Sequence, residues 1–294
     1  MILVVIGHVL FYGGLPNSFA CYAIYSFHMP LFFAISGFVA SFTFRPIGVG
    51  AYLVKISKRL LVPYILWSII YCLVFWQIDI PISDYWFIPC CWGLLAIFGI
   101  VEYIGTIKSQ KYIKPILLIN LIVGLVGFQM LYKTEMVKHM LAYIIPFYAG
   151  VCLAKFERLR DIMYHNKWLR IGCLLVWIAT LIQYYYTPDA SVASKLSRLV
   201  CGLSSIAVFF PLFYNLSAKT NLTERILELI GTNTIGIFFM HFLIVRHISL
   251  SLEWNVFLIG LVVLALAAII ISVCVLASHL LKKSAILKYL LLGK

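Results

Sequence analysis

Long apolar runs recur along the whole chain, and they constrain the fold more than any other feature. Runs of about 18 or more residues are typical of helices that cross a bilayer, because a spanning helix needs roughly 20 apolar residues. Of the 294 residues, 64% are hydrophobic and only 11% are charged, which is too little polar surface for a soluble domain of this length. The runs are continuous rather than alternating, which argues against a membrane β-barrel. The sequence therefore predicts an all-α, polytopic membrane protein.

We expect about ten transmembrane helices, which together make one membrane domain over residues 1–294. The first apolar stretch before Pro16 is short for a full crossing, so we expect this helix to be truncated and the natural chain to begin upstream of Met1. The alternative is a half-span that rests against other helices. Residues 44–59 are expected to form a re-entrant or interfacial segment. The expected spans cover residues 1–14, 24–43, 60–78, 86–104, 113–132, 138–155, 168–187, 196–215, 230–249 and 255–281.

The positive charges are distributed unevenly between these spans. The net charge is +13, and 18 of the 23 Lys and Arg residues follow the even-numbered spans or lie at the C-terminal end. Cytoplasmic loops of membrane proteins carry such an excess of Lys and Arg, so both termini are predicted to be cytoplasmic. No basic arm or nucleic-acid-binding motif is present. The charge therefore indicates membrane lipids rather than nucleic acid as a partner.

Two histidines lie in apolar stretches near the start of the chain. His8 falls in "MILVVIGHVLFYGG" and His28 in "YSFHMPLFFAISGF". An antiparallel pair of helices would place both imidazoles at a similar depth, where an ionisable side chain is a functional candidate because burying it is costly. Imidazole is also suited to proton transfer near neutral pH. For His28, the alternative is a polar group that reaches toward the membrane interface. His241 is a third deep imidazole, to which the sequence assigns no role.

Three cations share one helical face at a predicted membrane boundary. Lys55, Lys58 and Arg59 are spaced i, i+3 and i+4 in "KISKRLLVPY". Such a face can hold the phosphates of a nucleotide-like molecule, or it can contact lipid headgroups. Ser36 and Gly37 are expected to let helices approach closely. The eight cysteines show no metal-ligand spacing, so no metal site is expected.

Several segments together resemble the membrane-bound acyltransferase 3 family. In chain order they are "LVVIGH", "FHMPLFFAISGF", "KRLLVPYILWSIIY", "WFIP", "IPFYAGVCLA" and "LIGTNTIGIFFMH". The resemblance implies a ten-helix enzyme of the bacterial inner membrane. It would transfer an acyl group, usually acetyl, from cytoplasmic acyl-CoA to a hydroxyl of an extracytoplasmic glycan or lipid-linked sugar, as in modification of exopolysaccharide, capsule or O-antigen. Acetyl-CoA would be a co-substrate, and no tightly bound cofactor is implied.

The resemblance also implies roles for single residues. The histidine that ends the first motif is regarded as catalytic in the family, and here it is His8. It would act as general base or as nucleophile, and His28 would orient it or stabilise developing charge. The family's arginine about ten residues upstream of this histidine has no counterpart here, because only residues 1–7 precede His8. Lys55, Lys58 and Arg59 would hold the phosphates of CoA.

Two other functions stay open on the sequence. Ten spans, deep histidines and a basic face also suit a transporter or exporter of a glycan or small organic acid. The missing internal repeat and the matching motifs argue against this alternative. An inactive relative that serves as a partner in polysaccharide export is the third possibility.

Overall fold

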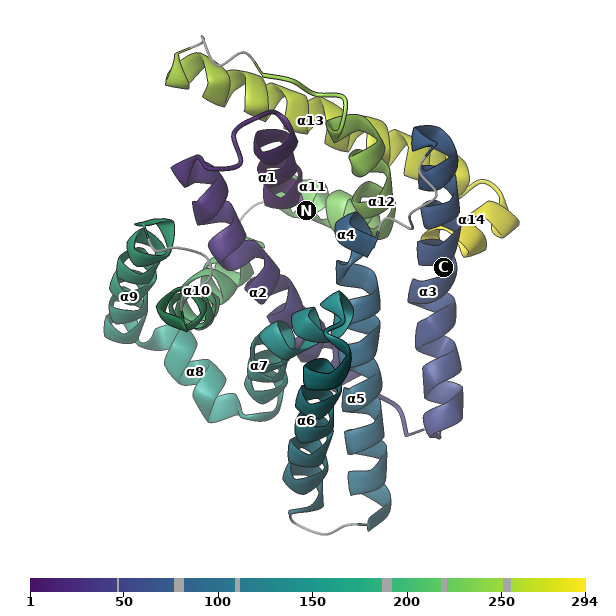
Figure 1. The fold of residues 1–294 in the computed structure, drawn as a ribbon, viewed down its shortest axis with the longest axis vertical. Helices are drawn as coiled ribbons and strands as arrows, with labels where there is room; N and C mark the ends of the chain where they lie inside the picture. The colour runs from purple at the N-terminus through teal and green to yellow at the C-terminus, as the bar shows by residue number, and fades with distance from the viewer. Residues whose placement is uncertain (47, 77–81, 109–111, 187–191, 218–220, 251–254) are drawn as a thin grey trace. The chain divides into compact units, whose positions relative to one another are not determined.

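A computed structural model describes the chain apart from residues 47, 77–81, 109–111, 187–191, 218–220 and 251–254 (Figure 1). All regular secondary structure in the described residues is helical. The helices are α1 (Ile2–Tyr12), α2 (Phe19–Thr43), α3 (Val49–Phe75), α4 (Ile82–Tyr85), α5 (Phe87–Lys108), α6 (Ile113–Tyr132), α7 (Glu135–Lys155), α8 (Glu157–His165), α9 (Lys167–Tyr186), α10 (Val192–Ser217), α11 (Asn221–Thr232), α12 (Thr234–Val245), α13 (Val256–Leu281) and α14 (Ala285–Leu292). The predicted all-α fold is confirmed.

The long helices match the predicted membrane spans. Among the described residues, 8 helices are long and apolar enough to cross a membrane, namely α2, α3, α5, α6, α7, α9, α10 and α13. The pair α11 and α12 qualifies together as one further span, bent by 75° at the break. The apolar helix α1 has 11 residues, which at 1.5 Å per residue makes it about 16 Å long. All ten predicted spans therefore fall on helices as far as the structure describes them, since residues 77, 78 and 187, at the ends of two of these spans, lie outside the described residues. One of the helices is short and one is bent, and the chain is a multi-pass membrane protein.

The segment before the third predicted span differs from the expectation. Val49–Phe75 is one continuous helix of 27 residues, so residues 49–59 do not form a separate re-entrant or interfacial segment. Packing against α5 explains the difference. The Tyr52 ring lies against Gly99, and its hydroxyl donates a hydrogen bond to the Leu95 carbonyl at 3.2 Å. These contacts keep a cation-rich stretch helical, and nothing in its charge pattern reveals them.

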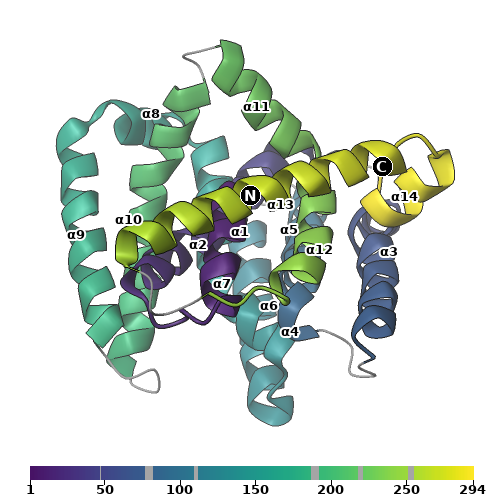
Figure 2. The ribbon, with the colours of Figure 1, turned by 90° about the horizontal axis from the view of Figure 1, so that it is seen from above.

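The chain divides into two compact units. The first comprises Met1–Phe32 and Asp161–Lys288, and the second comprises Phe33–Arg160 and Tyr289–Lys294. Within the first, α1 packs on α12 and α13, and α9 and α10 lie side by side (Figures 1 and 2). Within the second, α5 packs against α3, α6 and α7.

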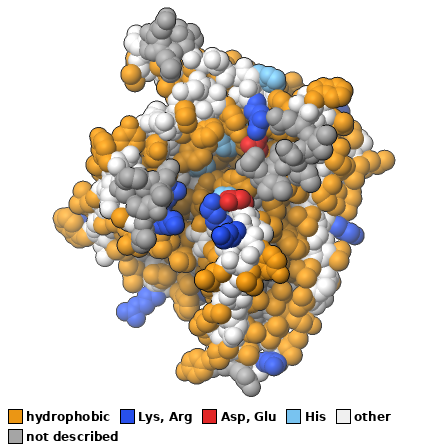
Figure 3. All heavy atoms as spheres, in the orientation of Figure 1, with side chains coloured by type: hydrophobic (Ala, Val, Ile, Leu, Met, Phe, Trp, Pro, Cys, Tyr) orange, Lys and Arg blue, Asp and Glu red, His pale blue; other side chains and the backbone are white. Residues whose placement is uncertain are grey.

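Apolar side chains cover much of the visible surface (Figure 3). Helix α6 is the extreme case, because it has no buried residue although it is strongly apolar. In water such a surface would be unfavourable, whereas in a bilayer it faces lipid while the helical backbone satisfies its own hydrogen bonds. The exposed apolar helices therefore agree with a membrane location.

Two glycines allow α2 and α7 to cross closely within the second unit. A Cβ atom on Gly37 would collide with the backbone carbonyl of Phe147, and one on Gly150 would collide with the backbone of Ala34. Contact between helix backbones is possible only where small residues lie at the crossing. The packing role predicted for Gly37 is therefore confirmed, and Gly150 is its counterpart on α7.

Candidate active site

Two histidines from distant parts of the chain meet in the first unit. Nδ1 of His8, on α1, lies 2.7 Å from Nε2 of His241, on α12. The two imidazole rings are nearly parallel, with an interplanar angle of 2° and centroids 5.0 Å apart. The packing of α1 on α12 brings them together. They form one hydrogen-bonded pair.

The hydrogen bonds of His241 determine which imidazole donates and which accepts in this pair. Nδ1 of His241 lies 2.8 Å from the carbonyl oxygen of Ile237, and a carbonyl only accepts, so this nitrogen carries the proton. In neutral His241, Nε2 is then the acceptor, and Nδ1–H of His8 must donate to it. This assignment follows from the hydrogen-bond network. In neutral His8 it leaves Nε2 with its lone pair, which is the arrangement of a general base.

The two imidazoles differ in their exposure. His241 is fully buried, at 0% exposure, whereas His8 keeps partial exposure. The ring of Phe242 packs against both, with its centroid 4.6 Å from that of His8 and 4.2 Å from that of His241. His8 is therefore the more accessible member of the pair, and His241 is its buried partner.

A break in the helix positions His241. Asn233 lies at the bend between α11 and α12 and is buried. Its amide donates to the Leu229 carbonyl at 2.7 Å, and its Oδ1 accepts from Nζ of Lys282 at 2.7 Å. Lys282 caps the C-terminal end of α13. These bonds tie the start of α12 to α11 and α13, and so set the place of the helix that carries His241.

His28 lies on the first part of α2, in the same unit, but it does not bond to His8. Its Nδ1 donates to the carbonyl of Ile24 within its own helix, at 2.8 Å. The Tyr25 ring contacts both imidazoles, with centroids 6.0 Å from His8 and 4.8 Å from His28. At 3% exposure His28 is buried, so the alternative of a side chain that reaches for the interface is wrong. The hydrogen bond to His8 that an orienting residue would make is made by His241, 233 residues away in the sequence, and the role of His28 in stabilising developing charge stays a prediction.

The predicted phosphate-binding cations lie in the second unit. The side chains of Lys55, Lys58 and Arg59 are all exposed on the first half of α3. Both predicted uses, binding phosphates and contacting lipid headgroups, require this exposure. Within the part of the chain that the structure describes, no group of three or more His, Cys, Asp or Glu side chains is placed to hold a metal ion.

Comparison with known proteins assigns most of the chain to one family model. A family model described as an acyltransferase domain, that of acyltransferase 3, matches residues 1–278. Searches among curated proteins and among solved structures gave no match. The family match covers both partners of the histidine pair, His8 and His241, and also the basic face of α3.

Proposed function

Because the chain belongs to the acyltransferase 3 family, we propose that it transfers an acyl group, acetyl in the first instance, from cytoplasmic acyl-CoA to a hydroxyl of an extracytoplasmic glycan or lipid-linked sugar. The observation that carries the proposal is the hydrogen-bonded pair of His8 and His241. Removing a proton from a sugar hydroxyl requires a base near neutral pH. In the tautomer of His8 that carries its proton on Nδ1, Nε2 has a lone pair that can accept the proton of the hydroxyl.

The chemistry follows from this tautomer. As the sugar oxygen attacks the thioester carbonyl, its proton passes to Nε2 of His8. The new ester C–O bond forms, the C–S bond breaks, and the departing CoA thiolate takes up the proton. The positive charge on the His8 ring is stabilised by the hydrogen bond from its Nδ1–H to His241. A route in which Nε2 first accepts the acyl group uses the same nitrogen.

The transfer itself is tested with two labels. Membranes that carry the chain, expressed from its full coding sequence, are incubated with the host's surface glycans and with acetyl-CoA that bears one label in the acetyl group and another in the CoA part. We expect the acetyl label to become covalently bound to glycan and the CoA label to remain free, which membranes without the chain should not show. A carrier would move glycan or small acid across the membrane without attaching the acetyl label, and that result would contradict the proposal.

His241 is expected to act as a positioning residue for His8. The His241→Ala variant should lower kcat at least about ten-fold and leave KM for acetyl-CoA little changed, since loss of the partner that fixes an imidazole tautomer costs up to about 10⁴-fold in catalytic triads. His241→Gln keeps a side-chain oxygen that accepts from Nδ1–H and should recover part of the loss. Steady-state kinetics in membranes tests this. A rise in KM at constant kcat would contradict it.

The basic face of α3 is expected to contribute to donor binding. Reversing its charge with Lys58→Glu and Arg59→Glu should weaken binding of acetyl-CoA at least about ten-fold, because hydrogen bonds between charged groups contribute about 1.5–3 kcal/mol each. Lys138→Glu is the matched control, because Lys138 is an exposed cation paired with Glu135 on α7. Equilibrium binding to the purified chain measures the effect. Unchanged affinity would leave lipid headgroups as the partners of this face.

A further inference from the structure

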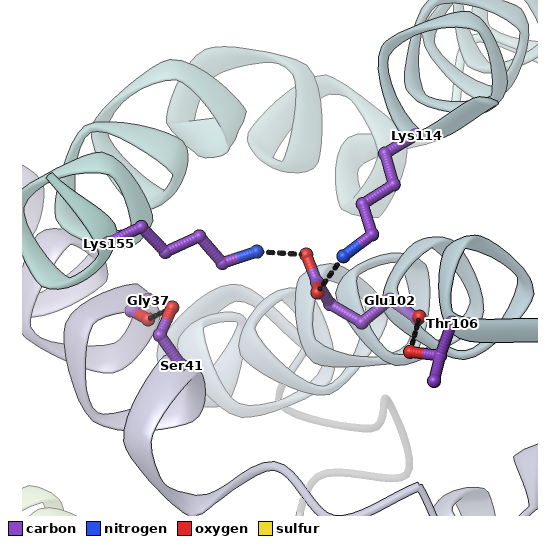
Figure 4. Close-up of polar contacts among 6 residues, drawn as sticks. All are labelled: Gly37, Ser41, Glu102, Thr106, Lys114 and Lys155. Atoms are coloured by element: carbon purple, nitrogen blue, oxygen red, sulfur yellow. Dashed lines mark hydrogen bonds and ion pairs between the residues drawn. The ribbon is translucent and has the colours of Figure 1, made fainter. Parts of the chain in front are cut away.

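A carboxylate of the second unit lies between two lysines that come from different helices. Oε2 of Glu102, on α5, accepts from Nζ of Lys114, on α6, at 2.8 Å, and its Oε1 pairs with Nζ of Lys155, at the end of α7. The two lysines approach the carboxylate from opposite sides (Figure 4). We call Glu102, Lys114 and Lys155 the Lys–Glu–Lys cluster. It brings together the C-terminal ends of α5 and α7 and the N-terminal end of α6.

The cluster carries more positive charge than the carboxylate needs. The Glu102 side chain is only 12% exposed, while those of Lys114 and Lys155 are 40% and 36% exposed. A single ammonium would neutralise one carboxylate, so the second leaves a surplus of one positive charge. Each ammonium has three N–H donors and uses one of them on Glu102. The remaining donors and the surplus charge suit an anion that presents several oxygens.

The pair formed by Glu135 and Lys138 at the other end of α7 is different. Its two side chains are 63% and 62% exposed, and its charges balance one to one. Exposed pairs of this kind contribute little to stability. The Lys–Glu–Lys cluster differs from this pair because it is partly buried and places two lysines on one carboxylate.

A buried hydroxyl lies on the same helix as one member of the cluster. The Oη atom of Tyr148 is buried and has no hydrogen-bond partner among the described residues. Tyr148 precedes Lys155 by two helical turns, so both belong to one face of α7. A buried hydroxyl without a partner is unfavourable, which makes Tyr148 a further donor for a ligand at this end of the unit.

The cluster lies beside the N-terminal end of α3, because Tyr52, in the first turn of that helix, packs against Gly99, one turn before Glu102. Nε1 of Trp92 donates to Oγ of Ser57, so α3 and α5 run antiparallel and the basic face of α3 leads away from this end of the unit. The count of Lys and Arg between the spans assigns this end to the cytoplasm, where acyl-CoA is found. The nucleotide part of CoA carries a diphosphate and a separate 3′-phosphate, so a site that binds it needs more than one group of cations.

We propose that the Lys–Glu–Lys cluster binds a phosphate group of the acyl-CoA donor, an inference that rests on the proposed acyl transfer. Glu102 holds the two ammonium groups in place, and the phosphate accepts hydrogen bonds from their remaining N–H donors when the donor binds. The carboxylate and the phosphate therefore compete for the charge of the same two cations. This competition predicts opposite effects for the members of the cluster.

Binding of CoA to the purified full chain tests the proposal. Lys114→Ala and Lys155→Ala should each weaken binding about ten-fold, because each removes hydrogen bonds between charged groups. Glu102→Gln should tighten it, because the competing charge is removed while the side chain keeps its shape. Lys138→Ala is the matched control and should bind CoA as the wild type does. A cluster that only ties the helix ends together would instead lose thermal stability in all three variants, without a gain in affinity for Glu102→Gln.

Dephospho-CoA, which lacks the 3′-phosphate, identifies the group that binds. If Lys155→Ala weakens binding of CoA but not of dephospho-CoA, the cluster holds the 3′-phosphate. If it weakens both equally, the cluster holds the diphosphate. Wild-type affinity in both lysine variants, or weaker binding in Glu102→Gln, would overturn the inference while acetyl transfer by the wild type persists. A wild-type chain that neither binds CoA nor transfers acetyl would overturn the proposed function together with it.

Discussion

Replacing His8 by alanine is expected to reduce acyl transfer to the level of membranes without the chain, while acetyl-CoA binding is retained. A positioned general base contributes about 10²–10⁴-fold to a rate, and the structure gives the partly exposed His8 the tautomer for this role. The loss should appear in kcat, measured as acetyl label on glycan over time.

His165→Ala is the matched control for this result. His165 is an exposed imidazole on α8 whose Nδ1 bonds to the Asp161 carbonyl within its own helix. Its removal should leave transfer unchanged. Transfer at the wild-type rate in the His8→Ala variant would remove this residue from the mechanism, whatever the control shows.

Replacing Gly150 by alanine is expected to destabilise the second unit. The added Cβ would collide with the backbone of Ala34 on α2, and a backbone cannot turn away as a side chain can. Overpacking typically costs about 1–3 kcal/mol, and a collision with backbone belongs at the upper end of that range. The cost exceeds the gain of about 1 kcal/mol in helix propensity that alanine brings over glycine. The temperature of unfolding in detergent should therefore fall.

Gly124→Ala is the control, because it is not expected to lower the unfolding temperature. Gly124 lies on the exposed helix α6, where an added Cβ would meet no atom within 4 Å. The same chemical change there should leave the unfolding temperature unchanged or raise it, because only the helix propensity differs. Equal effects at the two positions would contradict the close crossing of α2 and α7.

The helices were largely predictable from the sequence, because apolar length alone identifies a membrane span. The residues at which the helices begin and end were less predictable. Residues 49–59 carry three of the cations singled out in the sequence, which favours an interface, yet they continue α3 because Tyr52 packs on Gly99. The bend before α12 likewise depends on Asn233 and its bond to Lys282. Contacts of this kind are made in three dimensions and leave no periodic pattern.

The candidate site was predictable in its members but not in its pairing. The cost of burying an imidazole singles out His8, His28 and His241 one by one. Which of them bonds to His8 depends on how α1 packs against α12, and sequence proximity favours His28, the wrong partner. The Lys–Glu–Lys cluster was not predicted either, because its three members come from separate helices.

The central claim is that His8 and His241 form one hydrogen-bonded pair that leaves Nε2 of His8 to accept a proton. Solid-state NMR of the chain in lipid bilayers, with ¹⁵N-labelled histidine, tests it directly, and loss of signals in the His8→Ala and His241→Gln variants assigns the two residues. We expect a neutral His8 with its proton on Nδ1 and a ¹⁵N–¹⁵N coupling across the hydrogen bond to Nε2 of His241. A proton on Nε2 of His8, or no coupling between the two rings, would contradict the account.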